Sequence, residues 1–305
     1  MQVTCIGGAC VDRSYRVQGN AEAGSSNPAV RALPLFGGVA RNVSENLARL
    51  GIQCALFTAV GNDALGTALL SELRASGVNI DLVKIVEESS DEYVAILERG
   101  ELALGAADMG AIESLTVDDL DRRWEAVAGS GWVFVDCNVS AGVLQTCLAR
   151  ASIARYKLAI DAVSEPKARR LPARLDPVDV LFINEGEACA YLGADRSAPA
   201  EELAAALLAR GARSVVLTGG ERGVICGSGA SLTRVPASPV ARVSATGAGD
   251  ALVAGTLWKL IAGGTLCDAA RTGAELAALT LQTDRSVRAD LSPALLDEQT
   301  AERSR

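Results

Sequence analysis

The sequence predicts an α/β protein built on a largely parallel sheet. Short apolar runs rich in β-branched residues alternate along the chain with segments in which apolar residues recur at helical spacing. Apolar residues make up 49% of the 305 residues and charged residues 22%, which is typical of a folded protein. The length suits one large domain or two ordinary ones.

The expected elements follow this alternation in order. Strands are expected at 3–10, 54–60, 132–136, 158–162, 180–183 and 214–217. Helices are expected near 41–50, 65–76, 117–127, 141–151, 186–192, 200–210, 250–262 and 267–282. In the first helix Val43, Leu47 and Leu50 recur at steps of four and three, and Gly51 is placed to end it.

Two segments interrupt the alternation. Residues 13–36 are polar and rich in Gly, Asn and Ser, and residues 92–107 have the pattern of two short strands around Arg99 and Gly100. We expect them to form a small β lid, because insertions near the carboxyl ends of parallel strands often cover a ligand site. Residues 1–305 are then a single domain with this lid. The charged end, 295–305, is expected to be frayed.

Composition excludes several classes of function. The chain has no histidine, which rules out Ser-His-Asp and Cys-His catalysis and histidine-ligated zinc. Its eight cysteines form no C-x-x-C pair and are expected to be buried thiols. The net charge of −8 argues against a nucleic-acid partner. No apolar run is long enough for a membrane helix and no signal sequence opens the chain, so a cytoplasmic protein is expected.

A run of small residues, 245–250, reads Ala-Thr-Gly-Ala-Gly-Asp and precedes an apolar helix. Such a run lets backbone N–H groups at the positive end of the helix form an anion hole. Asp250 could then accept a proton from a hydroxyl placed over these amides, as phosphoryl transfer to an alcohol requires. A Gly-rich turn with Asp as a helix cap fits the same six residues, and these alone do not decide.

Two further groups could bind a polar ligand. Gly37 and Gly38 enter a helix with Asn42 on its first turn, which allows close approach of a hydroxyl-rich molecule. Asp12 ends the first strand region and could accept two hydrogen bonds from a vicinal diol. An ordinary strand-to-helix turn and a solvated loop carboxylate are the alternative interpretations.

Two later strands end in polar or glycine-rich residues. Asn184 and Glu187 provide oxygen ligands that suit a hydrated Mg²⁺, and a helix-capping pair explains them equally well. The stretch 217–223 could admit a nucleotide phosphate or sugar, or be a tight turn without a ligand. Neither a G-x-G-x-x-G fingerprint nor a G-x-x-x-x-G-K-[ST] loop occurs in the sequence.

Taken together, the motifs at 7–12, 37–42, 59–66, 184–187, 218–223 and 246–250 resemble, in order and spacing, those of the ribokinase-like (PfkB) carbohydrate kinase family. The resemblance covers nearly the whole chain. It implies a three-layer sandwich with a central, mostly parallel sheet and a small β lid. It also implies an ATP-dependent kinase that uses Mg²⁺ and a small-molecule substrate, with no nucleic acid or membrane as partner. Many members dimerise through the lid, so a homodimer is one expectation.

Within that family the chain is most similar to the pseudouridine kinases. The similar stretches include 26–28, 107–109, 136–138 and 161–167. This resemblance implies transfer of a phosphoryl group to the ribose 5′-hydroxyl of pseudouridine, giving pseudouridine 5′-phosphate and ADP. The alternatives are a kinase for uridine, inosine, adenosine or a free sugar, and a catalytically silent relative that binds nucleosides.

The resemblance also implies roles for individual residues. Asp250 is the implied base, and the amides of Gly247, Ala248 and Gly249 stabilise the transferring group. The residues implied to bind the nucleoside are Asp12, Ser26, Asn27, Gly37, Gly38, Asn42, Asp108, Lys167 and Asp250. Those implied to bind ATP are Asn184, Thr218, Gly219, Gly220, Gly223, Thr246, Gly247, Gly249, Ala270 and Gly273. Asn184 and Glu187 would hold Mg²⁺ through water.

The sequence departs from the family pattern at two places. Cys10 stands where many members have an asparagine two residues before the strand-end aspartate, and a thiol cannot donate the same hydrogen bonds to the sugar. Ser244 and Ala245 stand where ribokinase-type members have an Asp-Thr pair that helps to bind a monovalent cation. Because the carboxylate ligand is missing, a monovalent cation is less expected as a cofactor.

Overall fold

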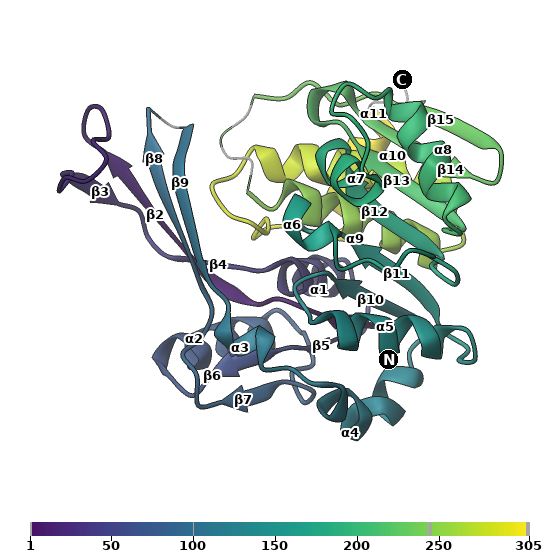
Figure 1. The fold of residues 1–305 in the computed structure, drawn as a ribbon, viewed down its shortest axis with the longest axis horizontal. Helices are drawn as coiled ribbons and strands as arrows, with labels where there is room; N and C mark the ends of the chain where they lie inside the picture. The colour runs from purple at the N-terminus through teal and green to yellow at the C-terminus, as the bar shows by residue number, and fades with distance from the viewer. Residues whose placement is uncertain (1, 100, 242, 244–245, 303–305) are drawn as a thin grey trace.

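A sheet of eight strands forms the centre of the computed structural model, which describes residues 2–99, 101–241, 243 and 246–302 (Figure 1). Across the sheet the strands are β15 (Ser231–Val235), β14 (Val224–Ser228), β13 (Ser214–Thr218), β12 (Val180–Asn184), β11 (Lys157–Asp161), β10 (Trp132–Asp136), β1 (Val3–Ile6) and β5 (Cys54–Phe57). The six strands from β13 across to β5 pair in parallel, and β14 and β15 extend the sheet as antiparallel strands at one edge.

Helices cover both faces of this large sheet, so the molecule has three layers. Along β10, Val133 and Val135 pack into one hydrophobic core and Trp132 and Phe134 into the other, as the two-residue period of a strand requires. The first core is closed by α3 (Gly110–Glu113), α4 (Val117–Ala128), α5 (Ala141–Ala151), α6 (Glu165–Ala168), α7 (Glu185–Leu192) and α8 (Ala200–Ala209). The second is closed by α1 (Val39–Arg49), α2 (Ala64–Ala75), α9 (Ala248–Ile261), α10 (Leu266–Leu281) and α11 (Pro293–Glu302). The expected three-layer α/β sandwich is confirmed.

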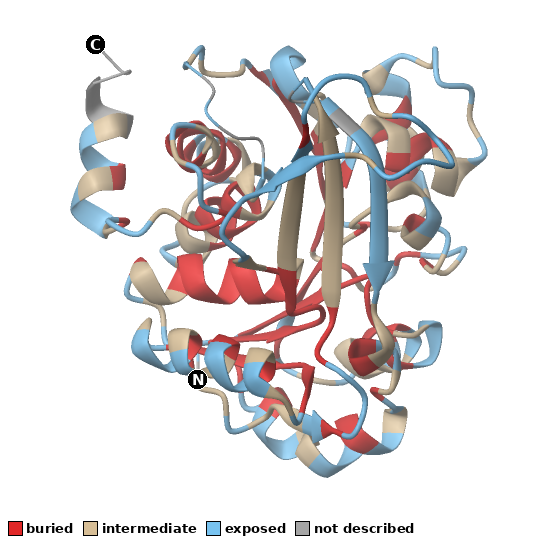
Figure 2. Cartoon of the chain, turned by 90° about the vertical axis from the view of Figure 1, so that its left-hand side faces the viewer, coloured by how far each residue is buried: buried red, intermediate tan, exposed pale blue. Residues whose placement is uncertain are grey.

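A second, smaller sheet stands away from the large one (Figure 1). Hereafter called the small sheet, it consists of β2 (Cys10–Val17), β3 (Ala29–Arg31), β4 (Leu35–Gly37), β8 (Glu92–Glu98) and β9 (Glu101–Asp108). Strands therefore form in both segments where the alternation breaks. Figure 2 looks onto this sheet, whose strands are mostly half-buried or exposed, in contrast to the buried strands behind it. A short pair, β6 (Ala59–Gly61) and β7 (Lys84–Val86), completes the strands.

Two expected strands are interrupted. The chain leaves the large sheet after Ile6 and enters the small sheet at Cys10, because the N–H of Gly8 turns to donate a 2.9 Å hydrogen bond to Asp136. Likewise the strand expected at 54–60 breaks at Thr58, where the chain leaves the large sheet and pairs with β7 instead.

The C-terminal expectation is wrong as far as Glu302, because α11 forms there and Leu296 is fully buried in the second core. The expectation for the cysteines is confirmed for seven of them, which are buried free thiols, whereas Cys267 is half-buried. Among the helices that the structure describes, none is long and apolar enough to cross a membrane.

Candidate active site

The first turn of α9 exposes backbone amides at the carboxyl edge of the large sheet. Gly247 precedes the helix with φ 79°, and a Cβ there would lie 2.0 Å from the backbone oxygen of Ser286, so only glycine fits. Gly249 is exposed, and a Cβ built on it would meet no atom within 4 Å. Because the first N–H groups of a helix have no intrahelical partner, this open turn can bind an anion.

Asp250 lies on the same turn and faces the start of α1. Asn42 Nδ2 donates a 2.7 Å hydrogen bond to Asp250 Oδ2, while Asn42 Oδ1 accepts a 2.9 Å bond from Arg41. Burial raises the pKa of Asp250 to about 7, the charges of Asp136 and Asp12 add to the rise, and the bond from Asn42 opposes it. A carboxylate with a pKa near 7 suits a general base at neutral pH.

Arg41 holds Asn42 in this orientation through its hydrogen bond to Asn42 Oδ1. Its side chain is only 2% exposed and forms ion pairs with Glu45 and, at 2.9 Å, with Glu72 on α2. It also donates a 3.1 Å hydrogen bond to the backbone oxygen of Phe36. A buried guanidinium with this many partners keeps one geometry, and its hydrogen bond to Asn42 therefore fixes the orientation of the Asn42 amide.

Asp136 is a fully buried carboxylate at the end of β10 that joins three segments. It accepts hydrogen bonds from the N–H groups of Gly8 at 2.9 Å, Ala40 at 2.8 Å and Asn138 at 2.9 Å. A Cβ at Gly7 would lie 2.2 Å from its Cγ, so the chain passes directly over it. Burial raises the pKa of Asp136 despite these bonds. It therefore sets how β1, α1 and β10 meet.

The sequence analysis assigned no site role to Asp136. The available signal was the one used for Asp12, a carboxylate at the end of a buried strand. The sequence does not show that three backbone N–H groups donate hydrogen bonds to Asp136, because these groups come from separate segments.

Asp12 lies beside the glycines that open α1. A Cβ on Gly37 would be 2.2 Å from Asp12 Oδ2, and one on Gly38, whose φ is 97°, would be 2.5 Å from the backbone oxygen of Gly8. Cys10 donates a weak 3.5 Å bond to Asp12 Oδ1. Burial raises the pKa of Asp12 to about 6, with opposing effects from Cys10 and the nearby Arg41. The glycines leave the carboxylate room to face a ligand.

Lys167 brings a positive charge to this acidic region. Its Nζ donates a hydrogen bond to Asn138 Oδ1, and its charge lowers the pKa of the Cys10 thiol, whose overall shift is upward because of burial. The lysine thus lies near the end of β10 and near Cys10, the first residue of the small sheet.

The end of β11 carries a second carboxylate that the sequence analysis did not assign to the site. Burial, then the charges of Glu187 and Asp250, raise the pKa of Asp161 well above its usual range. Its Oδ1 accepts a 2.8 Å hydrogen bond from the N–H of Val163, which has φ 68°. A β-branched residue in this left-handed conformation is strained, and such strain is common at functional sites.

Asn184 and Glu187 form a capping box at the start of α7. Asn184 Oδ1 accepts a 2.8 Å bond from the N–H of Glu187, and Glu187 Oε2 accepts a 2.9 Å bond from the N–H of Asn184. The capping interpretation is therefore confirmed, and burial raises the pKa of Glu187. In the ranges covered by the structure, no three His, Cys, Asp or Glu side chains are grouped so that they could hold a metal ion alone.

The glycine-rich turn after β13 lies beside Asn184. Thr218 is the register neighbour of Asn184 across β12 and β13, and the N–H of Gly219 donates a 2.8 Å bond to the oxygen of Gly223. Gly220, with φ 60°, is exposed at the tip, whereas a Cβ on Gly223 would lie 2.2 Å from the oxygen of Val235. The turn is thus open at Gly220 and packed at Gly223, while a Cβ on Gly219 would lie 2.5 Å from Glu185 Oε1.

Four further residues were expected to contact the nucleoside or ATP. Ser26 is exposed and Asn27 is half-buried in the β2–β3 connection, where the Asn27 amide closes its own turn through bonds with Glu22 and Ser25. Ala270 is fully buried on α10, and a Cβ on Gly273 would lie 2.3 Å from Thr256 Oγ1 of α9. Helix packing accounts for these last two.

The remaining sequence assignments lie at or outside the edge of the site. Thr246 is exposed directly before Gly247. Ser244 and Ala245, on which the expectation for a monovalent cation rests, lie outside the described residues.

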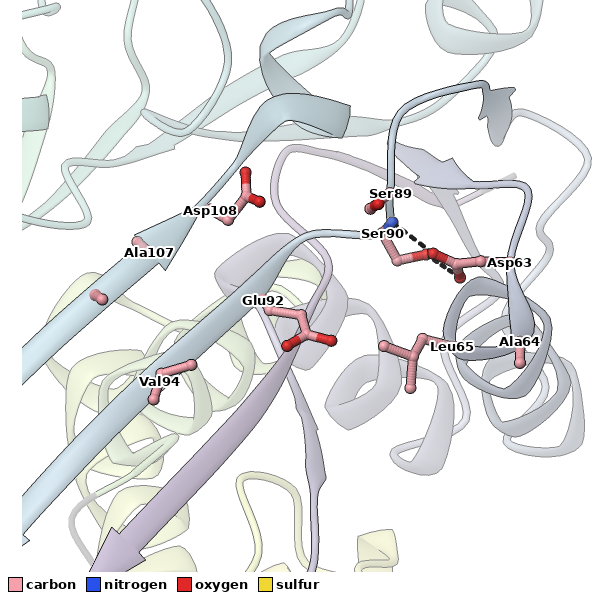
Figure 3. A pocket seen from close by; sticks show the side chains of 10 residues that line it. Asp63, Ala64, Leu65, Ser89, Ser90, Glu92, Val94, Ala107 and Asp108 are labelled. Atoms are coloured by element: carbon pink, nitrogen blue, oxygen red, sulfur yellow. Dashed lines mark hydrogen bonds between the residues drawn. The ribbon is translucent and has the colours of Figure 1, made fainter. Parts of the chain in front are cut away.

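Asp108 lines a pocket of about 570 Å³ between the small sheet and α2 (Figure 3). Glu92 lines the same pocket and forms a 2.9 Å ion pair with Arg13, the residue after Asp12. Because successive side chains of a strand point to opposite faces, this pocket lies on the face of the small sheet opposite to Asp12. At the pocket's edge, Asp63 caps α2 and accepts a 2.8 Å bond from Ser90 Oγ.

Comparisons with known proteins agree with this arrangement. The family model described as pfkB family carbohydrate kinase matches residues 1–290. The pseudouridine kinase of Escherichia coli is 30% identical to the chain, over 95% of this chain and 93% of its own length. A carbohydrate kinase from Agrobacterium tumefaciens superposes with a TM-score of 0.83 at 30% identity, covering 99% and 97% of the two chains. A ribokinase from Cryptococcus neoformans in complex with ADP has the same fold, with a TM-score of 0.79 at 20% identity, covering 98% and 99%.

The protein is therefore an ATP-dependent kinase of carbohydrates or nucleosides with the ribokinase-like fold. It belongs to the PfkB family of carbohydrate kinases.

Proposed function

We propose that this kinase phosphorylates the ribose 5′-hydroxyl of pseudouridine and releases pseudouridine 5′-phosphate and ADP. The observation that carries the chemistry is Asp250, a carboxylate with a pKa raised to about 7 and aimed by Asn42, next to the open amides of α9. The observation that supports the substrate is the similarity to the pseudouridine kinase of Escherichia coli over nearly the whole of both chains.

In the proposed mechanism Asp250 takes the proton from the 5′-hydroxyl as the oxygen attacks the γ-phosphorus of ATP. The amides of Gly247, Ala248 and Gly249 stabilise the charge on the transferring phosphoryl group, since they are fixed before the reaction and need no reorganisation. The geometry supports these two roles, because Asp250 and the three amides lie on the same helical turn.

The sugar is proposed to lie between Asp12 and the Gly37–Gly38 turn. A carboxylate can accept two hydrogen bonds from the 2′- and 3′-hydroxyls, and the glycines allow the ribose to come close to the backbone. Asn42 has a second N–H that can meet a sugar hydroxyl while the first is bonded to Asp250. Lys167, near Cys10 and Asn138, adds positive charge on the phosphoryl path.

ATP is proposed to lie along Thr218, Gly219 and Gly220, next to Asn184. Bound Mg²⁺ neutralises charge on the phosphates, and Asn184 and Glu187 are proposed to hold it through water, because no group of ligating side chains among the described residues suffices alone. The buried packing of Ala270 and Gly273 against α9 gives no support to adenine contacts by those two residues.

We further propose that the chain is one kinase domain whose small sheet acts as a lid. This sheet begins directly after the end of β1 and carries Asp12, so its movement would bring the sugar contacts toward Asp250 and exclude water from the reaction.

ADP release with Mg·ATP tests the proposal against a panel of pseudouridine, uridine, cytidine, inosine, adenosine, ribose and fructose. We expect pseudouridine to exceed uridine by about tenfold or more in kcat/KM. A higher rate with another nucleoside or a sugar would retain the kinase chemistry and overturn the substrate. Absence of turnover with every compound would contradict both.

A further inference from the structure

Tyr93 occupies a position beside Asp12 that the proposed mechanism does not use. Strands β2 and β8 are parallel, and Asp12 and Tyr93 are direct register partners. Register partners point to the same face, and neighbouring strands lie about 4.8 Å apart. The tyrosine side chain therefore shares the face of the small sheet on which Asp12 lies, opposite to the pocket that Glu92 lines.

The other neighbour of Asp12 offers no comparable surface. Leu35 of β4 is the register partner on the second side of β2, so Asp12 is flanked by a leucine and a tyrosine. Only the tyrosine has an aromatic face on which a flat molecule can stack.

A glycine lets the Tyr93 ring lie along the sheet. Gly105 of β9 is paired with Ala95 and lies two residues before Ala107, the partner of Tyr93. A Cβ built on Gly105 would lie 2.5 Å from Tyr93 Oη and 3.1 Å from Cζ, so the ring extends over the glycine. Tyr93 is half-buried, and Gly105 is exposed. The strands of the small sheet thus hold the ring flat and leave it accessible.

The covalent structure of a nucleoside determines where its base would lie. If the 2′- and 3′-hydroxyls are held by Asp12 and the 5′-hydroxyl is held near Asp250, the base leaves the sugar from C1′, which is bonded to C2′. C1′ lies at the C2′ end of the diol, whereas C4′, which carries C5′, lies at the C3′ end, so the base and the reacting oxygen leave the sugar at opposite ends of the diol that Asp12 would hold. Tyr93 is the aromatic neighbour of Asp12.

We propose that the ring of Tyr93 is the surface on which the base of the nucleoside stacks. This inference rests on the proposed function, because it requires a nucleoside at Asp12. Every nucleobase has a π face, so stacking recognises a base without distinguishing pseudouridine from uridine. Tyr93 then selects nucleosides over free sugars, and the choice among nucleosides depends on other contacts.

The test compares Tyr93→Ala with Tyr15→Ala. Tyr15 follows Arg13 by two residues in β2 and so lies on the opposite face of the same sheet, which makes it a matched control. Calorimetry gives the Kd of pseudouridine and uridine, and steady-state assays give kcat and the KM for ATP. We expect Tyr93→Ala to raise the Kd of both nucleosides by about 10- to 100-fold, with kcat, the KM for ATP and the melting temperature nearly unchanged. Tyr15→Ala should leave the nucleoside Kd unchanged.

A second variant moves the ring without removing it. Gly105→Ala would push the end of Tyr93 off the sheet, and we expect an intermediate loss of nucleoside affinity, whereas Tyr93→Phe should bind almost as the natural protein does. Unchanged affinity in Tyr93→Ala, or equal losses in Tyr93→Ala and Tyr15→Ala, would overturn the stacking role while leaving the proposed function intact. If the natural protein binds no nucleoside in the same titration and phosphorylates only a free sugar, both proposals fail.

Discussion

Asn42 donates a 2.7 Å hydrogen bond to Asp250 and so joins two residues that are 208 positions apart in the chain. The bond connects the first turn of α1 to the first turn of α9. Because Arg41 donates to the amide oxygen of Asn42, the amide can present only its N–H groups to Asp250. A neutral donor thus faces the carboxylate proposed as the base. Its main effects are on the orientation and the pKa of that carboxylate.

The first prediction concerns the pH dependence of Asn42→Ala. A hydrogen bond to the ionised carboxylate lowers its pKa, so losing this bond raises the pKa of Asp250 above its present value of about 7. We expect the acidic limb of the kcat/KM profile, near pH 7 in the natural protein, to move to higher pH. Activity lost at pH 7 should be partly recovered at pH 9. A uniform loss at every pH, without movement of the limb, would show that Asn42 does not act through this ionisation.

The second prediction is that Asp250→Asn inactivates the protein and stabilises it. Loss of a positioned general base should lower kcat by about 10²- to 10⁴-fold. Because burial raises the pKa of Asp250 to about 7 from 3.8, the folded state binds more protons than the unfolded state between these values. The contribution of Asp250 to the stability of the natural protein therefore falls as pH rises from about 4 to 7.

The stability half of this prediction is measured by thermal melts at two pH values. The variant should melt above the natural protein at pH 8, and this difference should shrink toward pH 3, below the unfolded-state pKa of 3.8, where the carboxylate is mostly protonated in both states. A variant that is less stable at pH 8 would show that Asp250 is stabilising when ionised, contrary to the effect of burial.

Much of the fold could be predicted from the sequence because the buried strands and amphipathic helices have regular periods. The strand at 132–136 and the helix at 141–151 match β10 and α5 residue for residue. The antiparallel strands β14 and β15 were not predicted, because glycines flank and interrupt Val224–Ser228 and because Ser231–Val235 is mostly exposed. Short strands that depend on an edge partner carry little local signal.

The role of a site residue could be predicted from the sequence where it depends on neighbouring residues in the chain. It could not be predicted where it depends on tertiary contacts. Asn184 and Glu187 gave their capping box directly from spacing. Gly273 could not be assigned from sequence, because a glycine that admits a ligand and one that admits a neighbouring helix look alike, and here the neighbour is Thr256. Tyr93 was missed because its place beside Asp12 depends on strand register, which no local pattern gives.

The third prediction contrasts two glycines of the anion-binding turn. Gly249→Ala meets no protein atom within 4 Å and places a better helix former in α9, so the variant should be as stable as the natural protein or more stable by about 0.5–1 kcal/mol. If the phosphoryl group approaches this turn, the added methyl group displaces it, and kcat/KM should fall about 10- to 100-fold.

Gly247→Ala provides the comparison for this prediction. It combines φ 79° with a Cβ only 2.0 Å from the oxygen of Ser286, so we expect a lower melting temperature together with lost activity. Melting curves and steady-state kinetics on both variants separate the two effects. Full activity in Gly249→Ala would contradict a phosphoryl group at these amides.

The fourth prediction is that Asp136→Asn destabilises the protein although the change is isosteric. Oδ2 of Asp136 accepts bonds from Gly8 and Ala40, and Oδ1 accepts one from Asn138. An asparagine must turn its NH₂ group toward one of these sets of donors, so at least one buried N–H loses its partner. We expect unfolding to become easier by about 2–4 kcal/mol, which denaturant titration measures.

The same substitution at an exposed carboxylate is the control. Asp297 is exposed on α11, and Asp297→Asn should change the free energy of unfolding by less than about 0.5 kcal/mol. Because Asp136 fixes Gly8 and the first turn of α1, its loss should also displace the sugar-binding glycines and raise the KM for the acceptor more than that for ATP. Equal stability of Asp136→Asn and the natural protein would mean that the three amides find other partners, and the role of Asp136 in joining β1, α1 and β10 would then be refuted.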